Sequence, residues 1–326
     1  TTGLHDGVTI RCLYTFCSPG LSSHGIAENQ RQRLKVYSPS QTAAFMENPL
    51  YRELCYLEGW HPITLGYPDR ALVAGAGFNV GVTTYYGDSL GMPRENILKS
   101  AEGVAEEYIK DRLARLEQQG FQWKEDANPG DLAKSVKIAV ERYIAQDPLP
   151  KEWLVAVEPS YTEFGHARPD IVLRSPFLTP VDVKFKQTLD EDRRAQAISE
   201  YAYSWQFMHY IWATAGHYQE PCQNSGLILV RMRPFQVWVE FFPVDPELQL
   251  IWYVSARSAW AVMGAMDGQP EPLLELIEQY AAKGQGIPPW LTFKWYGRYG
   301  RDAMAAAVLD YKLDENLMTQ SYIKAK

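Results

Sequence analysis

Two short stretches, Arg168-Pro-Asp-Ile-Val-Leu-Arg174 and Pro180-Val-Asp-Val-Lys-Phe-Lys186, carry the most informative pattern of this sequence. Both read as β-strands, and residues two apart in a strand point to the same face of the sheet, so Asp182 and Lys184 are expected to project together. Asp170 precedes Asp182 by 12 residues, a separation that one turn between adjacent antiparallel strands closes. The sequence therefore predicts two carboxylates and an ammonium group at one strand pair.

This combination of groups suits the hydrolysis of a phosphodiester. Two carboxylates can hold a divalent metal ion, and the ammonium of Lys184 would lie beside the water bound to that ion. Glu158 ends an earlier apolar run, Trp153-Leu-Val-Ala-Val-Glu158, and supplies a third acid. The strand pair is therefore a candidate catalytic site with Asp170, Asp182, Lys184 and Glu158.

A simpler interpretation applies to the same residues. An Asp-x-Lys triplet is short, and most such triplets form a solvated ion pair on an edge strand. Here Val181, Val183 and Phe185 alternate with the polar residues, which predicts a half-buried strand with a distinct polar face. The alternation favours a functional site over a chance ion pair.

Further motifs appear in a fixed order on both sides of this pair. Before it come Ser38-Pro-Ser-Gln41, Asn48-Pro-Leu-Tyr-Arg-Glu-Leu54 and Gly75-Ala-Gly-Phe-Asn-Val-Gly-Val82, and after it comes Gln206-Phe-Met-His-Tyr210. Together with the two strands, this set resembles the PD-(D/E)XK nuclease superfamily, in particular its RecB-like exonuclease branch. The resemblance covers about residues 36–215. It implies an α/β fold with a mixed central sheet flanked by helices, an N-terminal helical extension and C-terminal helices.

The resemblance also implies a metal site. Asp170, Asp182 and the backbone carbonyl of Val183 would bind Mg²⁺ or Mn²⁺, with Glu158 completing the shell directly or through water. Asn79 stands where the family has a metal-ligating histidine, and its amide oxygen is a ligand that Mg²⁺ or Mn²⁺ accepts. Lys184 would position the attacking water, help to deprotonate it and neutralise charge on the scissile phosphate.

The implied substrate is DNA, cut to products with 5′-phosphates and fed from an end or as a single strand. Gln206 and Tyr210 are four residues apart and so share one helix face, where the resemblance places them beside DNA. Lys186 and Arg168 flank the motif strands and are further candidate DNA contacts. Gln196 and Tyr201 are five apart and off-face, so we discount them as an alternative pair, and His209 and His166 are expected to be a packing and a turn histidine. A helicase or recombination protein would be a natural partner.

The chain departs from the family in its cysteines. Asn48 replaces the cysteine expected before proline, and the aromatic stretch 288–300 replaces the C-terminal cysteine cluster. An iron–sulfur cluster needs four well-placed thiolates. The four cysteines, Cys12, Cys17, Cys55 and Cys222, contain no Cys-x-x-Cys pair, so we expect no iron–sulfur cluster.

Composition agrees with a soluble enzyme. The chain has 326 residues, 46% of them apolar, which is enough for a large core. It contains no apolar run of the ~20 residues that a membrane helix needs, and no signal-peptide pattern, so we expect a cytoplasmic protein of a bacterial or phage-infected cell. The net charge of −7 predicts salt-sensitive DNA binding through local basic groups.

We divide the chain into an N-terminal strand and helical region at 1–150, a catalytic core at 151–245 and a C-terminal helical, aromatic-rich segment at 246–326. Strands are expected near 153–158, 168–174, 180–186, 226–232 and 236–242, and a further one at 8–16. Helices are expected near 39–59, 75–86, 94–119, 131–146, 190–215, 246–266, 270–283 and 301–310.

Two other functions stay open. A non-catalytic DNA-binding or scaffold subunit could keep the nuclease fold, and Asn79 and the missing cysteines are what that hypothesis predicts. Against it, Asp170, Asp182 and Lys184 are all present. A buried charged cluster without a role is costly, so a subunit that had lost catalysis would be expected to lose one of them first. A PD-(D/E)XK endonuclease would share the strand motif, but the preceding helices and the Gln206–Tyr210 pair favour an exonuclease.

Overall fold

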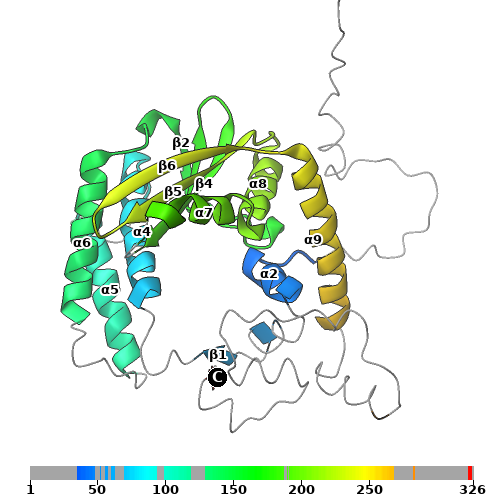
Figure 1. The fold of residues 1–326 in the computed structure, drawn as a ribbon, viewed down its shortest axis with the longest axis horizontal. Coiled ribbons are helices and arrows are strands. Elements are labelled where there is room, and N and C mark those ends of the chain that lie inside the picture. Colours follow the sequence, from blue (N-terminus) through cyan, green and yellow to red (C-terminus); the bar gives the residue numbers. More distant parts are fainter. Residues whose placement is uncertain are drawn as a thin grey trace, which may run out of the picture.

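The computed structural model describes residues 35–47, 52, 56–57, 60–62, 70–93, 99–118, 129–186, 189, 191–267, 282 and 322–324. These residues form an α/β fold in which helices flank a mixed five-stranded sheet (Figure 1). None of the described helices combines the length and the apolar character required to span a lipid bilayer.

The central sheet has the strand order β2-β3-β4-β5-β6. Its strands are β2 (Leu154–Val157), β3 (Ile171–Arg174), β4 (Leu178–Lys186), β5 (Asn224–Arg231) and β6 (Gln236–Pro243). All pairs are antiparallel except β4 with β5, which is parallel and therefore needs a crossover connection. The five strands confirm those expected between residues 153 and 242.

The strand that carries Asp182 and Lys184 differs from the expectation in one respect. β4 lies in the middle of the sheet, and helices cover both of its faces, so it is not half-buried. Its apolar residues Val181, Val183 and Phe185 belong to the core on one face. Its polar residues point to the opposite face, where other helices shield them from solvent.

Three helices cover the first face of the sheet: α4 (Arg70–Ser89), α5 (Ala101–Gln118) and α6 (Pro129–Gln146). They pack closely because α4 carries glycines where its neighbours approach. A Cβ atom at Gly77 would lie 2.4 Å from Ile109 Cγ1, and one at Gly81 would lie 2.7 Å from Val140 Cγ2. The Gly-rich motif is thus part of a helix–helix contact. It lies within a helix, as expected for residues 75–86.

Two expected helices have different bounds. The helix expected from residue 94 begins at Ala101, because Ser100 precedes it as a residue of the type favoured at helix starts and its carbonyl accepts the Val104 N–H. The single helix expected at 190–215 is two helices, α7 (Glu191–Ala202) and α8 (Trp205–Tyr218). Ser204 separates them, since its Oγ accepts the Phe207 N–H at 3.3 Å and caps α8.

The second face of the sheet is covered by α7, which packs on β5, and by α8, which packs on β4. Beyond α8 lie α9 (Pro246–Asp267) and α2 (Pro39–Glu47), which contact each other (Figure 1). Short 3₁₀ turns, Lys151–Trp153 and Thr162–Phe164, flank β2, and a separate antiparallel pair joins β1 (Trp60–Pro62) to β7 (Tyr322–Lys324).

Several expectations fall on other parts of the chain. The strand at 8–16, the helix at 301–310 and the helix at 270–283, apart from residue 282, lie outside the described residues, as does most of 48–59. The domain boundaries at residues 150 and 245 stay a prediction. The helices α4–α6 and the strands do share one continuous core, so the helical region before residue 150 contributes to the fold of the sheet.

Candidate functional site

The two aspartates meet at the start of β3, where β4 continues beyond its pairing with that strand. The antiparallel register pairs Ile171 with Val181, which places Asp170 opposite Asp182. The Val183 backbone N–H donates a hydrogen bond to Asp170 Oδ2 at 2.6 Å, so this side chain replaces the strand partner that β4 lacks at that point. The sequence-based expectation that Asp170 and Asp182 converge is thereby confirmed.

Lys184 pairs directly with Asp182. Its Nζ contacts Asp182 Oδ2, and the side chains of Asp182 and Lys184 are 2% and 24% exposed. Burial lowers the pKa of Lys184, but the charge of Asp182 more than compensates, so the pKa lies above its ordinary value and the ammonium stays charged. A solvated ion pair on an edge strand is excluded by this burial and by the central position of β4.

Ionisation of both carboxylates at once is disfavoured. Burial, followed by the negative charge of Asp182, raises the pKa of Asp170 well above its ordinary value, although the Val183 N–H and Lys184 oppose this. Two carboxylates that contact each other, one buried and one partly buried, favour either a shared proton or a bound cation. The arrangement therefore has the electrostatic character of a cation site.

Asn79 reaches the site from α4. Its Nδ2 lies 3.3 Å from both carboxylate oxygens of Asp170, and its Oδ1 is buried without a hydrogen-bond partner. The oxygen and nitrogen of an amide exchange places by a rotation of the side chain, so Asn79 can present either atom to the space beside Asp170. An unpartnered amide oxygen next to two carboxylates fits a hard cation such as Mg²⁺ or Mn²⁺.

The expected ligand shell is less complete than the sequence suggested. Among the described residues, no group of three or more His, Cys, Asp or Glu side chains is placed to hold a metal ion. The oxygen donors brought together are therefore two carboxylates and one amide. Val183 enters the site through its N–H group, and its role as a carbonyl ligand stays a prediction.

Glu158 lies at the edge of the site instead of inside it. Its backbone N–H donates to the Asp170 carbonyl at 2.8 Å, which fixes β2 against β3. The residue has a φ of 45° and its carboxylate faces Arg168 at 3.9 Å, with side chains 40% and 64% exposed. Glu158 and Arg168 thus pair with each other at the surface, beside the two aspartates.

The glutamine and the tyrosine of α8 act as one unit. Gln206 Nε2 donates to the Tyr210 hydroxyl at 2.7 Å, which confirms that the two side chains share a helix face. Burial, and after it the negative charges of Asp182 and Asp170, raise the pKa of Tyr210. Because α8 packs on β4, this pair lies on the helix that covers the strand of Asp182, within electrostatic range of both aspartates.

Sequence reasoning missed Tyr201. The pair of Gln196 with Tyr201 was rightly discounted, because Gln196 bonds to Glu200 at 2.8 Å. Tyr201 itself, however, lies beneath both lysines of β4: its ring centroid is 5.7 Å from Lys184 Nζ and 5.5 Å from Lys186 Nζ. The alternation of Asp182, Lys184 and Lys186 predicts one polar face of the strand, but it does not indicate which residue of a covering helix packs against that face.

The two histidines agree with the expectations. His209 is 1% exposed, its Nε2 lies 2.8 Å from the Phe164 carbonyl, and burial lowers its pKa to about 4. It is a neutral packing residue among the rings of Trp212, Trp252 and Trp260. His166 is exposed in a turn, with a φ of 56°.

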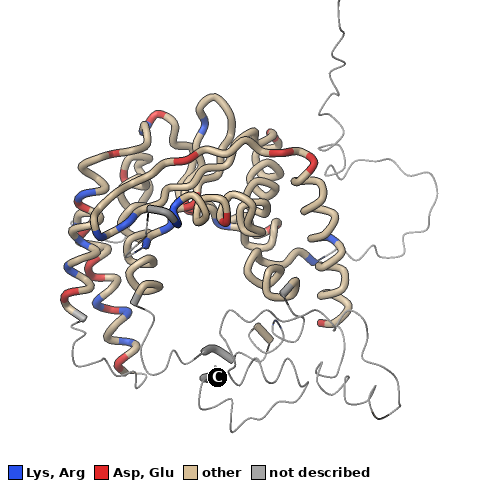
Figure 2. Tube along the Cα trace, in the orientation of Figure 1, with Lys and Arg blue, Asp and Glu red and all other residues tan. Residues whose placement is uncertain are grey.

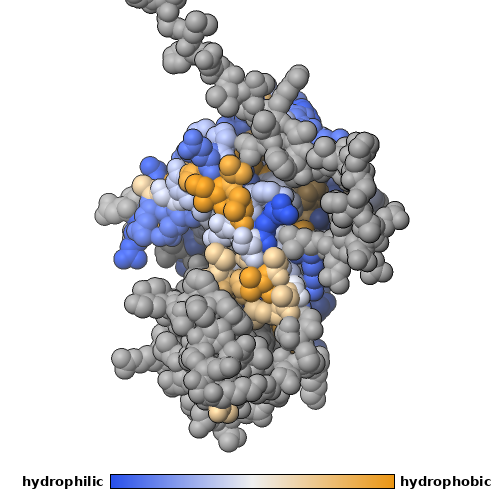
Figure 3. Space-filling view, turned by 90° about the vertical axis from the view of Figure 1, so that its right-hand side faces the viewer, coloured by the Kyte–Doolittle hydropathy of each residue, from blue (hydrophilic) through white to orange (hydrophobic). Residues whose placement is uncertain are grey.

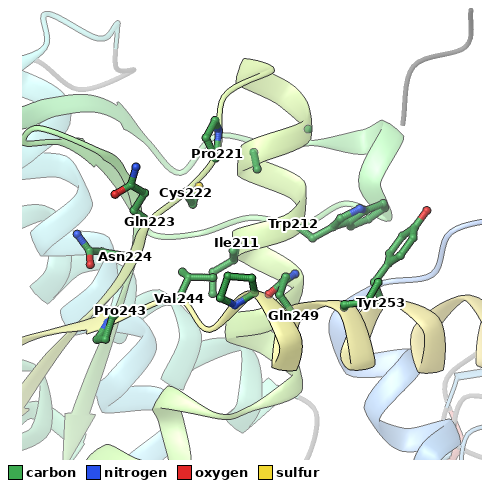
Figure 4. Close-up of a pocket in the computed structure, with 14 residues that line it drawn as sticks. Ile211, Trp212, Pro221, Cys222, Gln223, Asn224, Pro243, Val244, Gln249 and Tyr253 are labelled. Atoms are coloured by element: carbon green, nitrogen blue, oxygen red, sulfur yellow. The ribbon is translucent and has the colours of Figure 1, made fainter. Parts of the chain in front are cut away.

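A cavity of about 420 Å³ lies apart from these groups, between the second half of α8, the segment before β5 and the first turns of α9 (Figure 4). Its lining is mostly apolar, with Gln223, Asn224 and Gln249 as polar exceptions, and it contains no acidic or basic side chain. Apolar side chains are also exposed along α9, on the side of the molecule seen in Figure 3: Leu248, Leu250, Ile251, Val254 and Val262. Neither feature offers groups for acid–base or metal chemistry.

Comparisons with known proteins do not indicate a family or a function for this chain. No protein-family model matches the chain, and no curated protein matches it either.

Proposed function

We propose that this chain is a metal-dependent nuclease of the PD-(D/E)XK type, with an activity like that of the RecB-like exonuclease branch. The observation that carries the proposal is the partly buried Asp170 beside the buried Asp182, with Lys184 in contact with Asp182 on the central strand β4. The mixed sheet with its β2-β3-β4 meander, crossover helices and parallel β5 supports the same fold. The Gln206–Tyr210 hydrogen bond beside the carboxylates supports the exonuclease branch.

The residues would divide the work as follows. Asp170 and Asp182, with the Asn79 amide oxygen and the Val183 carbonyl, would hold Mg²⁺ or Mn²⁺, which polarises the scissile phosphate and acidifies bound water. Lys184 keeps its proton in the resting site, because Asp182 stabilises the ammonium. It would orient the attacking water and stabilise negative charge as the transition state forms.

The substrate proposed is DNA, with Tyr210 and Gln206 beside the strand near the carboxylates. Arg168 is 64% exposed and lies at the outer edge of the candidate site. It would contact a DNA phosphate after giving up its ion pair with Glu158, which is weak because both side chains are exposed. Glu158 would act through water at most, given its outward position. A helicase or recombination protein that supplies unwound ends would be a fitting partner, in the cytoplasm of a bacterial or phage-infected cell.

A second candidate is a non-catalytic DNA-binding subunit, and one observation favours it: Asn79 and the outward Glu158 leave only two acids facing each other. An endonuclease of the same superfamily differs from the main proposal only in whether a free end is needed.

One experiment separates these functions. End-labelled linear and closed circular DNA, single- and double-stranded, would be incubated with the protein in Mg²⁺ and in Mn²⁺, beside a Lys184→Met variant. We expect metal-dependent loss of linear DNA that Lys184→Met greatly slows. Cutting of the circle would identify an endonuclease, and binding of DNA without any cutting would establish the non-catalytic function.

A further inference from the structure

A second lysine projects from β4 beside the candidate site. Lys186 follows Lys184 by two residues, so the two side chains leave the same face of the strand about 7 Å apart. The backbone of Lys186 is fixed, because its carbonyl accepts the Met232 N–H at 2.9 Å and it pairs with Arg231 in β5. Its side chain therefore starts from a defined position at the end of a rigid strand.

One aromatic ring serves both lysines. Lys184 Nζ lies 5.7 Å and Lys186 Nζ 5.5 Å from the ring centroid of Tyr201, near the end of α7, and a ring face attracts cations at such distances. Tyr201 in turn packs against the buried Phe207, Leu227 and Leu229. The ring is thus anchored in the core, and both ammonium groups lie within reach of it.

The two lysines differ in their counterions. Lys184 contacts Asp182, whereas Lys186 forms no ion pair with any carboxylate among the described residues. Only one of these two like charges is therefore compensated within the described part of the protein. An anion that reached Lys186 would compensate the second.

We propose that Lys186 forms a second phosphate subsite, one nucleotide step from the phosphodiester beside Lys184, and that Tyr201 is the positioning residue for both lysines. The inference rests on the proposed function and narrows its substrate to a polynucleotide with consecutive phosphodiesters. Lys and Arg positions also gather near α7 and the β5–β6 turn (Figure 2). In α7, the Arg194 guanidinium lies 5.5 Å from the centre of the Trp238 ring of β6.

The first test compares substrates with and without a second phosphodiester. Hydrolysis of an oligonucleotide and of thymidine 5′-(p-nitrophenyl phosphate) would be measured in Mn²⁺ for the wild type and Lys186→Met. For each protein, kcat/KM for the oligonucleotide would be divided by kcat/KM for the nitrophenyl diester. We expect this ratio to be about tenfold lower in Lys186→Met, the effect of losing one phosphate contact. The change should come mainly from a higher KM for the oligonucleotide. A ratio equal to that of the wild type would overturn the inference.

Two Tyr201 variants test the positioning role. Tyr201→Phe keeps the ring face and should hydrolyse both substrates like the wild type. Tyr201→Leu removes the ring and should lower the ratio of oligonucleotide to nitrophenyl diester hydrolysis, as Lys186→Met does. Equal loss in both variants would show that the hydroxyl, not the ring face, matters. The matched control is Arg257→Met, because Arg257 lies 5.7 Å from the centre of the Tyr253 ring on α9, away from the site; it should not change the ratio.

Binding without turnover separates this inference from the proposed nuclease. A fluorescent oligonucleotide would be titrated in EDTA at several salt concentrations, and Lys186→Met should weaken binding and reduce the salt slope by about one. If the wild type binds but never cleaves and Lys186→Met shows this loss, the nuclease proposal fails and the phosphate subsite stands. If the wild type cleaves and Lys186→Met matches it in both assays, only the subsite fails. A wild type that neither binds nor cleaves overturns both.

Discussion

Asp170 and Val183 are joined by a hydrogen bond of 2.6 Å from the Val183 N–H to Asp170 Oδ2, directly before the first residue of β3, where β4 runs on past that strand. This bond fixes the carboxylate of one strand beside Asp182 of the next, and it uses the backbone of the very residue between Asp182 and Lys184. The pairing register of β3 and β4 therefore fixes the position of the candidate site. A site held by paired strands is more rigid than one held by a loop. Burial and the negative charge of Asp182 oppose the ionisation of Asp170 in spite of this bond, and that cost can be measured.

We predict that Asp170→Asn stabilises the metal-free protein but removes its response to metal. The raised pKa of Asp170 means that its ionised form is disfavoured in the folded state, a penalty that acts above the ordinary carboxyl pKa and so at neutral pH. Asparagine keeps an oxygen that can accept the Val183 N–H without carrying the charge. Thermal unfolding at pH 7 in EDTA should show a higher Tm for the variant.

The same samples with Mn²⁺ complete this test. A wild-type site should gain ~2.7 kcal/mol when the metal concentration is 100 times Kd, whereas Asp170→Asn should gain far less. Asp147→Asn is a suitable control, since Asp147 is a surface carboxylate that pairs with Lys151 at 3.8 Å. A wild type whose Tm ignores Mn²⁺ and Mg²⁺ would contradict the metal site.

Lys184→Met should lower the rate of DNA hydrolysis by ~10²–10³, the range expected when one group that stabilises transition-state charge is removed. The change also leaves Asp182 buried without its cation, which costs about 3–5 kcal/mol of folding stability. A loss of activity in Lys184→Met could therefore come from the lost ammonium group or from partial unfolding.

The double variant Asp182→Asn/Lys184→Met resolves that ambiguity. It removes both charges, so its stability should exceed that of Lys184→Met, while its activity should stay absent. Unfolding by urea and DNA cleavage would be compared for the wild type, Lys184→Met and the double variant. Recovery of activity together with stability would show that Lys184 is only structural.

The sheet and the core of the site could be predicted because strand periodicity determines both. The alternation of Val181, Val183 and Phe185 with Asp182 and Lys184 specified which side chains share a face, and the spacing to Asp170 matched an antiparallel neighbour. Burial on both faces of β4 was not predictable, because it depends on α7 and α8 lying over polar side chains.

Other features depend on contacts that the sequence does not encode locally. Glu158 adopts a positive φ of 45°, which is uncommon for this residue type and turns its side chain toward Arg168. Tyr201 joins the site only because α7 ends before Ser204 and packs on β5. The apolar periodicity across that break continues without interruption, so the cap at Ser204 was overlooked.

Gly81→Ala should destabilise the protein by about 1–3 kcal/mol, because the added methyl group would overlap Val140 of α6 and press against Ala105 of α5. Gly75→Ala offers a matched control in the same helix, since nothing lies within 4 Å of its added Cβ. That change should stabilise by about 0.4–1 kcal/mol through the unfolded chain. Urea midpoints of the two variants would be measured, and equal effects of the same sign would contradict the packing of α4 against α5 and α6.

Stability should fall as pH drops from about 6.5 to about 4, through His209. Burial lowers the pKa of this histidine from 6.5 to about 4, so within that range the unfolded chain binds a proton that the folded protein does not. The stabilisation is complete above the unfolded pKa and is lost as pH falls toward the folded value, with a limit of roughly 3 kcal/mol. His209→Gln cannot titrate, and its amide nitrogen can still donate to the Phe164 carbonyl that His209 Nε2 contacts at 2.8 Å. Urea unfolding of both proteins at pH 7.5 and pH 4.5 should therefore show a smaller loss for the variant; parallel losses would mean that His209 takes up its proton within the folded core.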